Sequence, residues 1–274
     1  MTNKAITIWV YEDEGTSELS VQSALVTAQV NLSSAYKIDV RTISSKEILE
    51  NVFDTTFNKT TPESRGLLIV PGGADLPYVH KLNGLGNDVI RKFISRGNIY
   101  IGICAGGYYG ARCIEFVGEG YEINGDRELA FFPGTAIGSI PSLTNGQLYD
   151  EAVGSKSVVT LNYADGQQDD VYYHGGAYFL GNKLGDKETD FTTLATYSNG
   201  KNAVVSGHVG KGQYLLSGVH FELCPTIYEE YAVAQAKESD IEKEAQLLSS
   251  IRHAHYGSLI YKQIERMMDE TFGT

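Results

Sequence analysis

A short apolar run that leads into a glycine cluster constrains this chain more than any other stretch. Residues 98–110 read NIYIGICAGGYYG, and Cys104 stands between Gly102 and Gly106. The apolar half is typical of a buried parallel strand. The spacing Gly-x-Cys-x-Gly is typical of a nucleophile elbow, with sulfur in place of a serine hydroxyl. A strand that turns sharply into a helix leaves no room for a Cβ two residues before or after the nucleophile, so the pattern predicts a strand–cysteine–helix turn.

Two interpretations of Cys104 follow from this turn. At the N-terminus of a helix the dipole and the free N–H groups favour a thiolate, which predicts a nucleophile. The N–H of the next residue, Ala105, would then donate to the oxyanion that forms when the thiolate attacks a carbonyl. The alternative is a buried structural cysteine in a glycine-rich turn.

Segments of strand and helix character alternate ahead of the elbow. Three apolar runs of strand length precede it: Ala5–Tyr11, Tyr36–Ile43 and Gly66–Val70. This alternation predicts βαβ units and a parallel sheet, in which functional residues gather at the carboxyl ends of the strands. Pro71-Gly72-Gly73 directly follows the third run. We therefore expect Gly73 to lie near Cys104 and to supply a second N–H to the oxyanion.

The pattern of apolar residues changes after Phe116. Short alternating runs then recur between turn residues: Val158–Tyr163, Asp170–Phe179, Ala203–Val209 and Gln213–Ser217. Lys211-Gly212 between the last two predicts a hairpin, and we expect these strands as antiparallel additions to the same sheet, within one domain of residues 1–224. From residue 225 onward the spacing of apolar residues is helical. It predicts a C-terminal helical extension, residues 225–274, packed on that domain; a partner-binding helix is the alternative.

A late histidine completes the candidate chemistry. Residues 217–222 read SGVHFE at the end of a predicted strand, which places His220 and Glu222 two residues apart. Residues i and i+2 of an extended chain point to the same side. Glu222 could therefore hold the imidazole in one tautomer while His220 serves as the base for Cys104. The alternative for His220 is an ordinary hydrogen-bonded histidine of the surface or core.

Charge and cysteine content exclude several classes of protein. A net charge of −12 argues against a nucleic-acid or anionic-membrane partner. Three widely spaced cysteines make neither a disulfide framework nor a zinc site, and they fit a reducing compartment. The first apolar run is too short for a signal peptide, and no run reaches the length of a membrane-spanning helix. We expect a cytoplasmic protein that acts on a small molecule without a metal or cofactor.

Taken in order, these motifs resemble a known superfamily. Pro-Gly-Gly, Gly-x-Cys-x-Gly and a late His-x-Glu are similar to class I glutamine amidotransferases, whose triad is Cys, His and Glu. Longer motifs resemble the N-terminal domain of biotin–protein ligases: Val70–Tyr78, Gly102–Gly110, Asp126–Gly134 and Tyr173–Gly176. The resemblance implies an α/β fold, a flavodoxin-like three-layer sandwich around a mostly parallel sheet. It also implies Cys104 as nucleophile, His220 as base and Glu222 as the residue that orients the base.

The sequence departs from these relatives at two points. Glutaminases of the superfamily carry Gln four residues after the nucleophile, where this chain has Tyr108, so we expect little or no glutaminase activity. Biotin ligases hold biotinyl-adenylate in a Gly-Arg-rich loop of a separate domain, and the sequence contains no such loop. We therefore expect that the chain does not biotinylate a protein on its own.

Further residues near the motifs are predicted to bind substrate: Gly72, Asp75, Tyr108, Tyr109, Arg127 and His174. Tyr108 and Tyr109 could line a pocket or pack against the sheet. Asp75 and Arg127 could anchor a polar substrate or pair with each other at the surface.

The sequence predicts a cysteine-dependent hydrolase or amidotransferase that acts on a small amide or ester. A separate partner enzyme could collect ammonia released in such a reaction. The alternative is a non-catalytic binding or regulatory module that keeps the fold. Cys104, His220 and Glu222 favour the enzyme, whereas Tyr108 favours the module.

Overall fold

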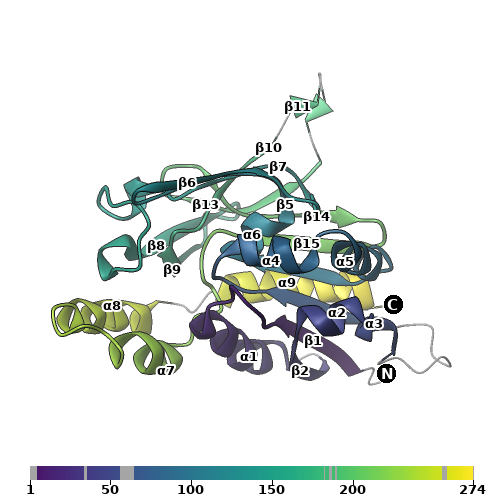
Figure 1. Ribbon diagram of the computed structural model, residues 1–274, viewed down its shortest axis with the longest axis horizontal. Helices are drawn as coiled ribbons and strands as arrows, with labels where there is room; N and C mark the ends of the chain where they lie inside the picture. Colours follow the sequence, from purple (N-terminus) through teal and green to yellow (C-terminus); the bar gives the residue numbers. More distant parts are fainter. Residues whose placement is uncertain are drawn as a thin grey trace.

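The computed structural model describes residues 5–33, 36–55, 65–181, 183–184, 187–188, 190–254 and 258–273 (Figure 1). Nine strands form its central sheet: β1 (Ala5–Tyr11), β2 (Lys37–Ile43), β3 (Gly66–Val70), β4 (Ile99–Ile103), β8 (Lys156–Tyr163), β9 (Gln168–His174), β13 (Thr192–Tyr197), β14 (Asn202–Val209) and β15 (Gly212–Ser217). Their order is β2-β1-β3-β4-β15-β14-β13-β8-β9. The first five strands in this order are parallel to one another. The remaining pairs, from β15 and β14 onward, are antiparallel.

The parallel half confirms the predicted flavodoxin-like fold, because β2-β1-β3-β4-β15 has the strand order of that fold. The antiparallel half confirms that β8, β9 and β14 are additions to the same sheet. The predicted run Asp170–Phe179 belongs to this sheet only as far as His174, and β15 joins the parallel half. β14 and β15 form the expected hairpin, closed by the pair Val209 and Gly212. On its other edge β15 runs parallel to β4, so residues that follow β15 lie beside the end of β4.

Helices cover both faces of the parallel half, as a three-layer sandwich requires. Successive strand residues point to opposite faces. Ile8 of β1 therefore packs in one core cluster with Ala24 and Ile264, whereas Trp9 packs in the other cluster against Phe93. The first face is covered by α1 (Glu18–Leu32) and α9 (Ser258–Phe272). The second is covered by α2 (Ser45–Leu49), α3 (Val52–Thr55), α4 (Asp75–Leu82), α5 (Leu85–Ser95) and α6 (Ala105–Gly110).

A second sheet, which the sequence did not predict, lies at the top of the molecule in Figure 1. It has the order β10-β7-β5-β6. Its strands are β5 (Ala111–Gly118), β6 (Tyr121–Asp126), β7 (Phe132–Gly138) and β10 (Tyr178–Gly181). Ile114 and Ala136 join the core cluster that also holds Tyr108 of α6. A small hairpin of β11 (Lys183–Leu184) and β12 (Lys187–Glu188) stands apart from both sheets.

The C-terminal residues form several helices that contact the rest of the chain at two places. They comprise α7 (Pro225–Tyr228), a π-helical turn (Glu229–Val233), α8 (Ile241–His253) and α9, and two short 3-10 turns lie earlier at Pro141–Leu143 and Val153–Ser155. α9 contributes to the main core, whereas Leu248 and Ile251 of α8 pack with Tyr172 of β9. The domain boundary at residue 224 stays a prediction. No helix in the described part of the chain is long and apolar enough to span a membrane.

Candidate active site

Cys104 lies at the junction of β4 and α6, in the sharp turn that the sequence predicts. Its backbone has φ 49° and ψ −105°, a conformation that side-chain-bearing residues rarely adopt and that is typical of functional turns. A Cβ on Gly102 would lie 2.3 Å from the Gly106 carbonyl oxygen, and a Cβ on Gly106 would lie 1.9 Å from that of Val70. The need for glycine on both sides of Cys104 is therefore confirmed.

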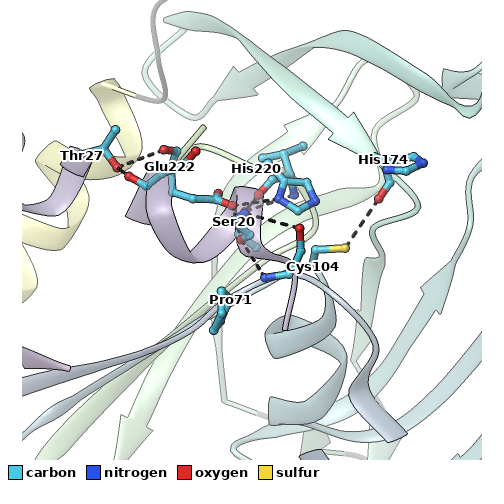
Figure 2. A network of polar contacts seen from close by, with 12 residues as sticks. Ser20, Thr27, Pro71, Cys104, His174, His220 and Glu222 are labelled. Atoms are coloured by element: carbon cyan, nitrogen blue, oxygen red, sulfur yellow. Dashed lines mark hydrogen bonds and ion pairs between the residues drawn. The ribbon is translucent and has the colours of Figure 1, made fainter. Parts of the chain in front are cut away.

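His220 and Glu222 follow β15 and contact each other (Figure 2). The imidazole Nδ1–H donates to Glu222 Oε1 at 2.8 Å, and the Glu222 side chain is fully buried. The imidazole also contacts the side chain of Cys104. Burial disfavours the imidazolium, but the negative charges of Glu222 and Cys104 outweigh burial and raise the pKa of His220 from 6.5 to about 10. The three side chains thus form a continuous chain from thiol to carboxylate.

Ser20 of α1, which the sequence analysis missed, fixes both Glu222 and the loop after β3. Its buried hydroxyl donates to Glu222 Oε1 at 2.6 Å and accepts the Gly72 N–H at 2.9 Å. Thr27, two turns further along α1, donates to the Glu222 carbonyl oxygen at 3.0 Å (Figure 2). The sequence showed Ser20 only as part of the first turn of a helix, and no local signal marks it as a partner of a residue so distant in the chain.

Gly72 and Gly73, which follow β3, have different roles in the site. The Gly72 N–H is committed to Ser20, and a Cβ on Gly72 would lie 2.5 Å from His220 Cε1, so this glycine makes room for the imidazole. The N–H groups of Gly73 and Ala105 have no hydrogen-bond acceptor among the residues that the structure describes. Both residues line the same cavity as Cys104.

That cavity has a volume of about 460 Å³. The structure brings together around it most of the residues that the sequence singled out: Gly73, Asp75, Cys104, Ala105, Tyr108, His174 and His220. The others do not line it: Gly72, Tyr109, Arg127 and Glu222. In the described part of the chain, no three His, Cys, Asp or Glu side chains converge on a point where they could hold a metal ion.

The two tyrosines after the elbow lie in different places. Tyr108 forms a wall of the cavity, and its hydroxyl donates to the Gly175 carbonyl oxygen at 3.0 Å. Tyr109 lies in the core, where its hydroxyl donates to Asn87 Oδ1 and its ring packs edge-on against Tyr78. The structure thus places Tyr109 away from any substrate in the cavity.

Asp75 and Arg127 pair in the interior and not at the surface. Arg127 Nε donates to Asp75 Oδ2 at 2.6 Å, and each residue is only 7% exposed. Asp75 reaches the cavity, whereas Arg127 lies behind it and also donates to the Asp126 carbonyl oxygen at 2.9 Å. The guanidinium therefore balances the charge of Asp75.

His174 contributes its backbone to the site. Its carbonyl oxygen lies 3.6 Å from Cys104 Sγ (Figure 2). Its ring Nε2 contacts the Asp150 carbonyl oxygen at 2.8 Å and Ser155 Oγ at 3.0 Å. Burial, above all, lowers the pKa of His174 to about 3, so its ring is neutral at physiological pH. His220 is the histidine with access to Cys104.

The second sheet supplies a side of the cavity that the sequence analysis missed. Its contributors are Ile114, Phe116, Tyr121 and Ile123, and they are joined by Tyr149 and Glu151 from the following loop. The available signal was an alternation of apolar residues, since Ile114 and Phe116, and likewise Tyr121 and Ile123, are two residues apart. Alternation alone does not tell which face of a strand will border a cavity.

The chain matches the family model described as "Biotin-protein ligase, N terminal" over residues 6–264. It belongs to this family. The biotin–protein ligase of Schizosaccharomyces pombe is 34% identical over 177 residues, which cover 59% of this chain and 26% of that protein. This member of the family thus spans about a quarter of the yeast ligase. An uncharacterized protein of Chlamydia muridarum is 32% identical over 200 residues, covering 68% of this chain and 72% of that one. A crystal structure of a glutamine amidotransferase matches with a TM-score of 0.49 and 19% identity, over 79% of this chain and 90% of that one.

Proposed function

We propose that this protein is a cysteine-dependent hydrolase or amidotransferase that acts on a small amide or ester. The observation that carries the proposal is the position of His220, whose imidazole contacts Cys104 and donates to the buried Glu222 carboxylate at 2.8 Å. This is the arrangement of nucleophile, base and orienting acid that acyl transfer needs.

The reaction begins from the Cys104 thiolate, whose proton is held by His220 as an imidazolium that Glu222 stabilises. The thiolate attacks the substrate carbonyl, and the N–H groups of Gly73 and Ala105 donate to the oxyanion. The imidazolium then protonates the leaving amine or alcohol as the tetrahedral intermediate collapses to a thioester on Cys104. Water or an acceptor amine, deprotonated by His220, attacks the thioester, and release of the acid or new amide restores the thiolate beside the imidazolium.

Tyr108 supports a substrate other than glutamine. Its ring narrows the cavity at the position where glutaminases of the superfamily have a primary amide, and its hydroxyl is committed to the Gly175 carbonyl oxygen. A site that recognises an amino acid needs free polar groups, and those left unpaired by a wrong ligand cost affinity. If the protein is an amidotransferase, a partner enzyme accepts the nitrogen.

One contact favours the second candidate, a non-catalytic binding module. Cys104 Sγ lies 3.6 Å from the His174 carbonyl oxygen, and a neutral thiol makes this contact as a donor. A thiol held in this way would leave the cavity as a binding site without turnover.

Active esters separate the two candidates. p-Nitrophenyl acetate should give a burst of p-nitrophenol and a mass increase of one acetyl group on Cys104, because a thioester accumulates when deacylation is slow. Cys104→Ser should abolish both signals. Glu222→Gln should lower kcat by up to about 10⁴-fold, by analogy with the carboxylate of other triads. Glu122→Gln, which removes an exposed carboxylate on β6, is the matched control. Equal rates in the wild type and in Cys104→Ser would favour the binding module.

A further inference from the structure

One face of the second sheet presents aromatic rings to the cavity. Phe116 of β5 and Tyr121 of β6 lie on the same face, because the antiparallel register pairs Phe116 with Ile123 and Gly118 with Tyr121. Tyr149, from the loop after β7, lies next to the ring of Phe116. The ring centroid of Phe116 is 5.9 Å from that of Tyr121 and 5.6 Å from that of Tyr149. We call Phe116, Tyr121 and Tyr149 the aromatic wall.

A carboxylate lies at the edge of the aromatic wall. Glu151 lines the cavity, is exposed to solvent, and accepts a hydrogen bond from the Tyr149 hydroxyl at 2.9 Å. It also lies near Tyr121, whose pKa is raised by burial and by the charge of Glu151. The aromatic wall and Glu151 therefore place aromatic rings and a negative charge around the same part of the cavity.

Away from Cys104 and His220, the charged side chains that line the cavity are acidic. The lining includes Asp75 and Glu151 but no Lys or Arg. Asp75 is balanced by Arg127 behind it, and no described cation forms an ion pair with Glu151. Because His174 stays neutral and Glu222 balances the charge of His220, the unbalanced charge of the cavity is negative.

We propose that the acyl group of the substrate carries a cationic amine that binds between the aromatic wall and Glu151. Alkylammonium groups are attracted to aromatic faces, and the attraction is strengthened by a nearby carboxylate. A cavity of about 460 Å³ has room for such a group together with the reacting carbonyl. This inference rests on the proposed function and names its substrate class.

Three esters that differ mainly in charge test the inference. They are the p-nitrophenyl esters of 4-(trimethylammonio)butyric acid, of its neutral isostere 5,5-dimethylhexanoic acid, and of 4-sulfobutyric acid. The cationic ester should have a kcat/KM about tenfold above the neutral one, as one cation–π site with a carboxylate supplies, and the anionic ester should be slowest. Glu151→Gln should reduce the cationic-to-neutral ratio several-fold. A ratio near one in the wild type would overturn the inference.

The matched control separates this site from the charge of the whole molecule. The net charge of −12 attracts any cation from a distance, and Glu122→Gln on β6 removes the same charge as Glu151→Gln. Glu122 does not line the cavity. The ratio should therefore fall in Glu151→Gln and persist in Glu122→Gln; an equal fall in both variants would assign the preference to long-range attraction and overturn the inference.

Thiol modification tests the same charge preference without turnover. Methanethiosulfonates that carry trimethylammonioethyl, methyl or sulfonatoethyl groups modify Cys104, and mass spectrometry of the Cys104 peptide gives each rate relative to a model thiol. The cationic reagent should react fastest, and Glu151→Gln should reduce that preference. If this holds while no ester is turned over, the proposed enzyme fails and the cation site stands. If esters are turned over without charge preference, the enzyme stands and the cation site fails.

Discussion

Replacement of Glu222 by Gln tests whether the buried carboxylate holds a proton on His220. Glu222 is fully buried and touches Nδ1 of the imidazole at 2.8 Å. The variant keeps the shape of the side chain and removes the charge. Burial has the largest effect on the pKa of His220 and lowers it. Without the charge of Glu222, only Cys104 opposes this effect, so the pKa of His220 should fall.

The magnitude follows from linkage between proton binding and folding. The pKa of His220 is about 10 in the folded protein and 6.5 in the unfolded chain. Protonation of His220 therefore stabilises the fold fully below pH 6.5, and this contribution is lost as the pH rises toward 10. Each pH unit between the two values removes about 1.4 kcal/mol, so the wild type should lose about 2–3 kcal/mol from this group between about pH 7 and pH 9.

Urea unfolding at a series of pH values measures this loss. In Glu222→Gln the pH-dependent decrease should shrink by most of that 2–3 kcal/mol, whereas Glu122→Gln should follow the wild type. The imidazole resonances of His220 in a two-dimensional NMR titration report the same proton directly. If the free energy of unfolding changed with pH by the same amount in the wild type and in Glu222→Gln, the argument that Glu222 raises the pKa of His220 would be refuted.

Three other perturbations test the site. Ser20→Ala removes the donor to Glu222 and the acceptor of a buried backbone N–H, so urea unfolding should show a loss of about 1–3 kcal/mol that the exposed-site control Ser142→Ala does not share. Glutamine at millimolar concentration should release no more ammonia from the wild type than from Cys104→Ser, because the Tyr108 ring and its committed hydroxyl do not accommodate an amino acid; clear release would restore glutamine as the substrate. Iodoacetamide should label Cys104 faster than the other two cysteines, as seen by peptide mass spectrometry, because its contact with His220 supports the thiolate; equal labelling would count against a nucleophile.

The elbow could be predicted from the sequence because its constraint at Gly102 is local. The atoms that exclude a Cβ at Gly102 belong to Gly106, only four residues away, so the spacing itself carries the geometry. The contact between His220 and Glu222 has the same origin, since alternation places residues i and i+2 on one side. The strands β3 and β4 were recognisable because strands buried on both faces are apolar throughout.

What the sequence did not predict depends on contacts between distant segments. Ser20 meets Glu222 across 202 positions, and Asp75 meets Arg127 across 52 in the interior, where the sequence offered only a pair at the surface. A hydroxyl early in a helix or a lone arginine has many possible partners, and only the assembled fold selects one. The second sheet was missed for a related reason: alternation marks a strand such as β5 but does not say to which sheet it pairs.

The proposed chemistry and the proposed substrate recognition of this site lie on separate parts of the fold. Cys104 and His220 follow two adjacent parallel strands, β4 and β15, whose register fixes how far apart the two side chains stand. The aromatic wall stands on the second sheet and the loop after it, and it contacts α6 where the Phe116 ring packs edge-on against Tyr108. Because Phe116 and Tyr121 can change without disturbing the strand ends, the same elbow could serve substrates of different charge. Substitutions in the aromatic wall should therefore change KM for the cationic ester more than the rate of acetylation of Cys104, which a single-turnover measurement with p-nitrophenyl acetate would show.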